Sequence, residues 1–304
     1  MNYIKNQKNS FFISMSSLLL MLVMINISCS QKSNKTSSQS DQSDTSIKIA
    51  YPNWAEGIAF THLAQAALLD KGYKVKITPM EPGPIYAALA KGGYDIMMDA
   101  WLPNTHNDYW AKYGDKLEKI GESFSDGTTG LVVPAYVEIN SIEELNANAD
   151  RFDGKIMGIE SGAGIHANTE KAIEEYALDF KQITSSGPAM LASLKRAYAK
   201  KEPIIITGWK PHYMWGDYEL KYLDDPKGVY PKDVCAIITR KDFKKDNPVV
   251  GEFLTNFNMK EPDLIDLLAK IKESDDTEIA AKKWYNNHKE LVESWMPEKM
   301  KANK

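Results

Sequence analysis

Short apolar runs alternate with helical patterns through most of this chain, and this alternation constrains its fold more than any other feature. The runs occupy residues 47–51, 74–78, 94–101, 130–134, 155–160, 182–186, 203–209 and 234–240. Helical stretches separate most of them, and Gly72 ends the first such stretch. Strands that alternate with helices predict an α/β protein with a mainly parallel sheet.

Two sets of these strand–helix units follow one another, and a helical region from about Asn247 to Trp295 has no strands of its own. We expect these late helices to pack back on the first set. This predicts two α/β lobes with a ligand cleft between them, an architecture typical of solute-binding proteins. The predicted parts are lobe 1 (47–131 and 240–297), lobe 2 (137–235), crossing segments near 130–136 and 234–240, and a C-terminal tail (298–304).

The first 28 residues have the pattern of a secretory signal peptide. Lys5 and Lys8 precede an apolar run at 11–27, and Ser28 precedes Cys29. A permanent single-span anchor is the alternative, although the run is near the lower length limit for a span. Cys29 resembles the acylated cysteine of bacterial lipoproteins, and residues 29–46 then form a lipidated, polar, flexible tether.

Composition excludes several functional classes. The net charge is −4 and no basic stripe occurs, so nucleic-acid binding is not expected. Cys235 is the only other cysteine, and we expect it to be a buried small hydrophobe. No CxxC pair or histidine spacing indicates a metal site, and the chain is predicted to need no cofactor.

The loops after the strands are the expected place for a ligand, because ligands of open α/β sheets bind at the carboxyl ends of strands. Three tryptophans stand at such ends: Trp54, Trp101 and Trp209. Any one alone is typical of packing in a core. Three together suit a trimethylammonium cation, which cannot donate classical hydrogen bonds and binds well to indole faces.

The turn SGAGIH at 161–166 opens a helix, so the main-chain N–H groups of Gly164 and Ile165 form a potential carboxylate site. His106 can donate a side-chain hydrogen bond to the same group. The alternatives are a purely structural glycine turn and a loop histidine that caps a carbonyl. Cage and anion site together favour a zwitterion.

In these residues the chain resembles a known family, the glycine betaine substrate-binding proteins of ABC importers that use three tryptophans. The resemblance covers residues 47–295, and its motifs are NW (53–54), AWLPNTH (100–106), GLVVP (130–134), GAGI (162–165), IIITGWKPH (204–212) and LKYLDDPKG (220–228). His166 and Tyr213 depart from the pattern that we expect of the family.

The resemblance implies a two-lobed periplasmic-binding-protein fold of type II. It implies that Trp54, Trp101 and Trp209 form the cage, and that His106, Gly164 and Ile165 bind the carboxylate. The chain would be a monomer, anchored by lipid outside the bacterial cytoplasm. It would deliver glycine betaine, or proline betaine, to membrane permease subunits that work with a cytoplasmic ATPase.

Other ligands and two other classes of protein are the alternatives. Carnitine, choline or dimethylsulfoniopropionate are alternative ligands, although choline would leave the carboxylate site idle. A secreted hydrolase would need Ser161 or Ser186 as its nucleophile, but no GxSxG elbow is present. An adhesion module would not need tryptophans at strand ends. We therefore predict a transport protein, not an enzyme.

Overall fold

A computed structural model describes residues 46–302 of the chain. The predicted signal peptide, Cys29 and nearly all of the predicted tether lie outside the described residues. Within residues 46–302, no helix has the length and apolarity needed to cross a membrane.

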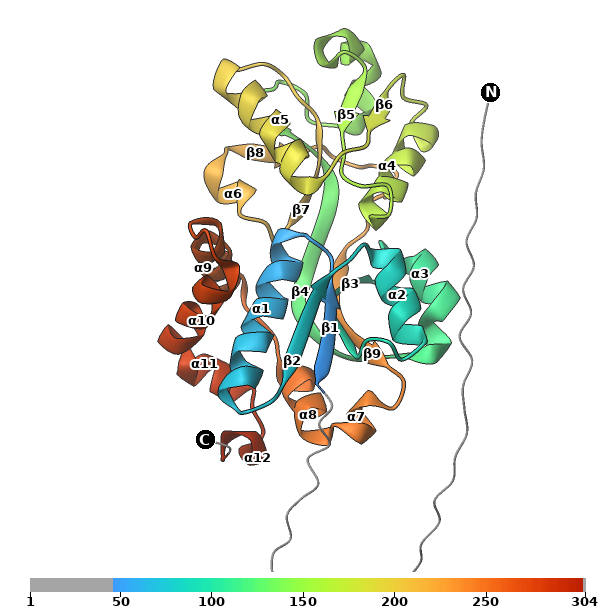
Figure 1. The fold of residues 1–304 in the computed structure, drawn as a ribbon. Helices are drawn as coiled ribbons and strands as arrows, with labels where there is room; N and C mark the ends of the chain where they lie inside the picture. The colour runs from blue at the N-terminus through green and yellow to red at the C-terminus, as the bar shows by residue number, and fades with distance from the viewer. Residues whose placement is uncertain (1–45, 303–304) are drawn as a thin grey trace, which may run out of the picture. The chain divides into compact units, whose positions relative to one another are not determined.

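The described chain folds into two lobes that share the long strand β4 (Leu117–Pro134) (Figure 1). Lobe 1 contains β1 (Ile47–Tyr51), α1 (Ala55–Asp70), β2 (Val75–Pro79), α2 (Pro82–Ala90), β3 (Ile96–Leu102), α3 (Asn107–Tyr113), β9 (Asp233–Arg240), α7 (Phe243–Asp246), α8 (Pro248–Asn256), α9 (Glu261–Lys272), α10 (Thr277–Asn287), α11 (Lys289–Ser294) and α12 (Glu298–Lys301). Lobe 2 contains β5 (Lys155–Met157), α4 (Gly164–Glu175), β6 (Lys181–Ile183), α5 (Gly187–Lys200), β7 (Ile206–Lys210), α6 (Met214–Asp217) and β8 (Leu220–Tyr222).

The strands follow the order β2-β1-β3-β9-β4-β7-β5-β6, with β8 also paired to β4. The outer pairs of each lobe are parallel, as the alternation of strands and helices predicts. The centre is antiparallel, because β9 pairs with β3 and β4, and β4 pairs with β7 and β8. The prediction of a mainly parallel sheet was therefore wrong for the centre of the sheet.

Strand β4 joins the two lobes by changing its partner. Residues Leu117–Gly127 pair with β9 in lobe 1, and residues Thr128–Pro134 pair with β7 and β8 in lobe 2. Only the last five residues of this strand, 130–134, were predicted from the sequence. The first part reads LEKIGESFSDGTT, and its polar residues hide the strand pattern.

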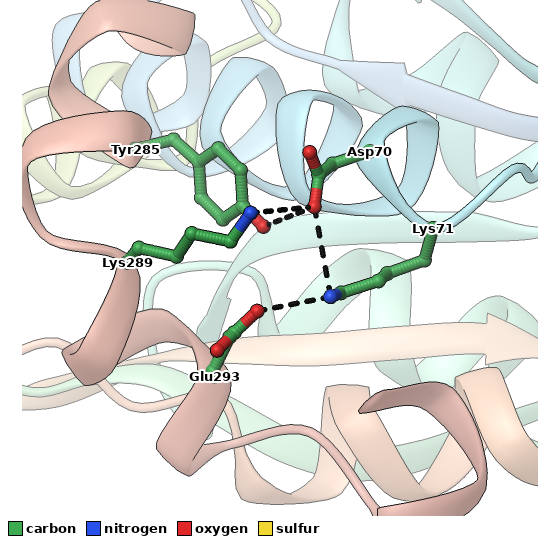
Figure 2. Close-up of polar contacts among 5 residues, drawn as sticks. All are labelled: Asp70, Lys71, Tyr285, Lys289 and Glu293. Carbon is green, nitrogen blue, oxygen red and sulfur yellow. Dashed lines mark hydrogen bonds and ion pairs between the residues drawn. The ribbon is translucent and has the colours of Figure 1, made fainter. Parts of the chain in front are cut away.

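The C-terminal helices pack against α1 of lobe 1, and Figure 2 shows the polar contacts that hold them there. Tyr285 on α10 donates to Asp70 at 2.8 Å. Lys71, whose side chain is almost fully buried, pairs with Glu293 on α11 at 2.9 Å. Residues predicted as a C-terminal tail include helix α12, whose Met300 is fully buried, so the folded chain runs further than expected.

Candidate ligand-binding site

The six residues predicted to bind a ligand lie around one cavity of about 260 Å³ between the lobes. Strand β1 leads to Trp54, which caps the N-terminus of α1, while Trp101 and Trp209 stand one residue before the ends of β3 and β7. All three tryptophans are almost fully buried. The complete lining is Trp54, Glu56, Trp101, Thr105, His106, Thr129, Ile159, Ala163, Gly164, Ile165 and Trp209.

Two of the three indole N–H groups donate to carboxylates on the opposite lobe. Trp54 in lobe 1 donates its Nε1–H to Glu160, which lies in the loop between β5 and α4. Trp209 in lobe 2 donates its Nε1–H to Glu56 on α1, with a distance of 2.8 Å. Charge-assisted bonds of this kind are shorter and stronger than neutral ones. Each ring is therefore held in part by a hydrogen bond from its own indole to a carboxylate of the other lobe.

His106 is fully buried between β3 and α3, and it has one unused donor. Its Nδ1 accepts from the main-chain N–H of Trp101 at 3.1 Å, and the hydroxyl of Tyr86 lies 3.4 Å away. Because a main-chain N–H can only donate, Nδ1 has no proton and Nε2 has it. Burial lowers the pKa of His106 to about 3, so the ring is neutral. Its buried Nε2–H has no partner.

Gly164 and Ile165 are the first two helical residues of α4, after the capping residue Ala163. Main-chain N–H groups at these positions have no acceptor within the helix, and they stand at its positive end. A Cβ on Gly164 would lie 2.0 Å from the carbonyl oxygen of Thr105 in lobe 1. The helix therefore approaches the other lobe so closely that only glycine fits.

Contacts between the lobes also occur on both sides of the cavity. Tyr109 on α3 donates its hydroxyl to the carbonyl of Gly162, next to α4, at 2.8 Å. Lys272 on α9 pairs with Asp217 on α6 at 2.6 Å. Figure 1 shows α3 and α4 on the right of the molecule, and α9 and α6 on the left. The lobes are therefore in a closed arrangement.

Sequence reasoning missed several polar residues of the site. Glu56 is fully buried, and its Oε1 has no hydrogen-bond partner. Thr129 also lines the cavity with an unpartnered hydroxyl. An acidic residue in the first turn of a helix is usually explained by the helix dipole, so Glu56 gave no separate signal. Only its position two residues after Trp54 could have pointed to the cage.

The remaining aromatic and histidine candidates lie outside the cavity lining. His212 packs edge-on against Trp209, with ring centroids 4.9 Å apart, and supports that indole from behind. His166 stands beside Glu170 on the surface of α4. Tyr213 lines a separate hollow, where the ammonium of Lys272 lies 5.4 Å from its ring centroid. Trp110 lies on α3, away from the cage.

The state of His106 can be tested by NMR. We expect its imidazole to stay neutral, with the proton on Nε2, from pH 8 down to about pH 4.5, because burial lowers its pKa to about 3. The measurement is a ¹⁵N–¹H titration in which the His106→Gln spectrum identifies the signal. In the urea-unfolded chain the same residue should titrate near about 6.5. A native titration near that value would contradict the buried neutral donor.

Comparison with known proteins adds a second line of evidence. The family model described as the substrate binding domain of ABC-type glycine betaine transport systems matches residues 45–287. The glycine betaine/carnitine transport binding protein GbuC of Listeria monocytogenes is 40% identical over 150 residues, which is 48% of this chain and 50% of that protein. The match thus spans half the length of that relative.

Solved structures agree with the family and with the predicted fold. Lactococcal OpuAC, in its closed conformation with glycine betaine, is 36% identical with a TM-score of 0.79, over 84% of this chain and 100% of the other. A choline-binding protein with choline is 25% identical with a TM-score of 0.77, over 82% and 91% of the two chains.

These relatives are binding proteins, so the prediction that the chain is not an enzyme is confirmed. The predicted two-lobed fold is confirmed as well. This chain belongs to the family of substrate-binding domains of ABC-type glycine betaine transport systems.

Proposed function

We propose that this protein is the extracytoplasmic binding component of an ABC importer that captures glycine betaine, or proline betaine, for osmoprotectant uptake. One observation supports this above all. A single cavity is lined by three indoles and also by three unused hydrogen-bond donors: the N–H groups of Gly164 and Ile165 and the Nε2–H of His106. The indoles suit a quaternary ammonium group, and the donors suit a carboxylate.

The energetics favour a ligand with both groups. Each cation–π contact contributes about 0.5–2 kcal/mol, and more in a desolvated site. A ligand without a carboxylate would leave the His106 donor buried and unpaired, at a cost of about 1–3 kcal/mol. Choline is such a ligand. Carnitine has the carboxylate, but its longer chain must fit a cavity of about 260 Å³. Both stay candidates, because relatives are named for binding them.

Binding is proposed to close the cleft. Trp54, Trp101 and His106 belong to lobe 1, whereas Gly164, Ile165 and Trp209 belong to lobe 2. A ligand that contacts both sets binds the closed form better than the open form, and it shifts the equilibrium toward closure. The permease subunits then recognise the closed form.

We also propose that the chain is a monomer attached to the outer side of the cell membrane through acylated Cys29. Two acyl chains give stable anchoring. The test is metabolic labelling with a clickable fatty acid in a bacterial host. Label on the wild-type chain and none on Cys29→Ser is the expected result. Equal label on both would rule out acylation at Cys29.

Ligand preference can be measured by calorimetry on the purified full-length chain. We expect the order glycine betaine, then carnitine, then choline, because only the first fits both halves of the site. Trp101→Ala should weaken glycine betaine binding at least about tenfold, since it removes cation–π and packing contacts together.

The matched control is Trp110→Ala, which removes a half-buried tryptophan outside the cavity. Its affinity should stay within about threefold of wild type, because this ring packs against the core of lobe 1 and does not line the cavity. Tighter binding of choline than of glycine betaine would contradict the carboxylate site. An unchanged affinity in Trp101→Ala would remove that ring from the cage.

The proposed closure of the lobes can be tested at Gly164, the first residue of α4. Gly164→Ala places a methyl group 2.0 Å from the carbonyl oxygen of Thr105, and backbone cannot move aside as a flexible side chain can. We expect a loss of about tenfold or more in affinity, and no ligand-induced compaction in X-ray scattering.

Gly162→Ala is the matched control for the closure test. A Cβ there meets its nearest atom, a carboxylate oxygen of Glu81, at 3.6 Å, which is ordinary van der Waals contact. Its affinity and compaction should resemble wild type. Equal behaviour of the two variants would show that closure does not require the close approach at Gly164.

A further inference from the structure

Two buried carboxyl groups lie behind the tryptophans, and no part of the proposed carboxylate site uses them. We propose that Glu56 and Asp99 form an acidic layer behind the cage, which selects a quaternary ammonium group over a neutral group of the same shape. This inference rests on the proposed function, because it names what sets the charge preference of that same cavity.

Both residues are placed for this role by elements of lobe 1. Glu56 in the first turn of α1 lines the cavity, holds the indole of Trp209 with Oε2, and leaves Oε1 without a partner. Asp99 stands on β3 two residues before Trp101, and only 1% of it is exposed. A Cβ on Gly57 would lie 2.8 Å from Asp99 Oδ2, so Asp99 packs against the same turn of α1.

Neither acid has a basic side chain as its partner among residues 46–302. The carboxylate of Asp99 has only the poorly aligned contacts of the Cys235 thiol and the Trp101 indole, and neither of its oxygens has a hydrogen bond of normal geometry. Among the described residues that line the cavity there is no lysine or arginine, and His106 is neutral. A buried carboxylate without a counterion is costly. The missing positive charge is therefore the one that the ligand brings.

The pKa values of the pair agree with an unpaired acidic site. Burial raises the pKa of Asp99 to about 7, although hydrogen bonding from the Cys235 thiol and the Trp101 indole lowers it in part. Burial and then the charge of Asp99 raise the pKa of Glu56 well above its usual range. The two acids thus resist carrying two charges together, and a cation at the cage would relieve this.

A role in charge selection differs from a role in orienting the ring. Replacing Glu56 with Gln keeps an oxygen that can accept from the Trp209 indole, but it removes the negative charge. Replacing Asp99 with Asn also preserves shape. If the acids only position the indoles, these variants should treat cationic and neutral ligands alike. If the acids supply a negative electrostatic field at the cage, the variants should lose the preference for the cation.

The experiment compares glycine betaine with 3,3-dimethylbutanoate, in which a neutral tert-butyl group replaces trimethylammonium. Dissociation constants are measured by calorimetry at pH 8 for the full-length wild type, Glu56→Gln and Asp99→Asn. Wild type should prefer glycine betaine strongly. In each variant that preference should fall at least about tenfold, because glycine betaine binds more weakly while the neutral analogue binds equally or more tightly.

The control variant is Glu81→Gln, which removes a carboxylate near Gly162 that is not the acceptor of the Trp54 or Trp209 indole. It should keep the wild-type preference. The proposal is overturned if Glu56→Gln and Asp99→Asn weaken both ligands by the same factor, or if Glu81→Gln has the same effect. Urea unfolding midpoints identify a variant that fails to fold, in which case the other variant decides.

Choline and its neutral analogue 3,3-dimethylbutan-1-ol separate this inference from the proposed function. If wild type binds choline instead of glycine betaine, the proposed ligand is wrong, and the same preference is measured with the second pair. A loss of preference in the variants then still supports the acidic layer. A wild-type chain that binds the cationic and neutral partners equally, or binds no cation, overturns it.

Discussion

Two tryptophan–glutamate hydrogen bonds cross the cleft, and the rest of the site depends on them. Trp54 reaches from lobe 1 to Glu160, and Trp209 reaches from lobe 2 to Glu56. Each lobe therefore orients a ring of the other. The cage is not complete in either lobe alone, so under the proposed function the binding surface forms as the lobes close. A small ligand that contacts both lobes would then control their relative position.

The central antiparallel strands make this coupling possible. Strand β4 runs without interruption from its pairing with β9 in lobe 1 to its pairing with β7 in lobe 2. Trp101 and Trp209 come from β3 and β7, the strands on either side of the central pair β9 and β4. A bend where β4 changes partner would therefore move the two rings relative to one another. The sheet supports the cage and also connects the lobes.

The sequence predicted the parts of the site that follow from strand position, and it missed those that follow from burial. The three tryptophans were found because chain segments after strands gather at the cleft. The acids were missed because Asp99 sits inside an apolar strand and Glu56 in a first helical turn, where each has an ordinary explanation. The first part of β4 was missed because its polar residues break the strand pattern. Only the fold brings these residues together.

The hydrogen-bond donors of the site carry no full positive charge, and this suits a zwitterionic ligand. A lysine or arginine would bind a carboxylate more strongly, but within a few ångströms it would also repel the ammonium group in a medium of low dielectric constant. His106 is kept neutral by burial, and the α4 N-terminus offers only partial charge. On the other side, the carboxyl groups of Glu56 and Asp99 are the proposed source of negative charge when a cation is bound. A site built in this way would match each end of the proposed betaine ligand without opposing the other.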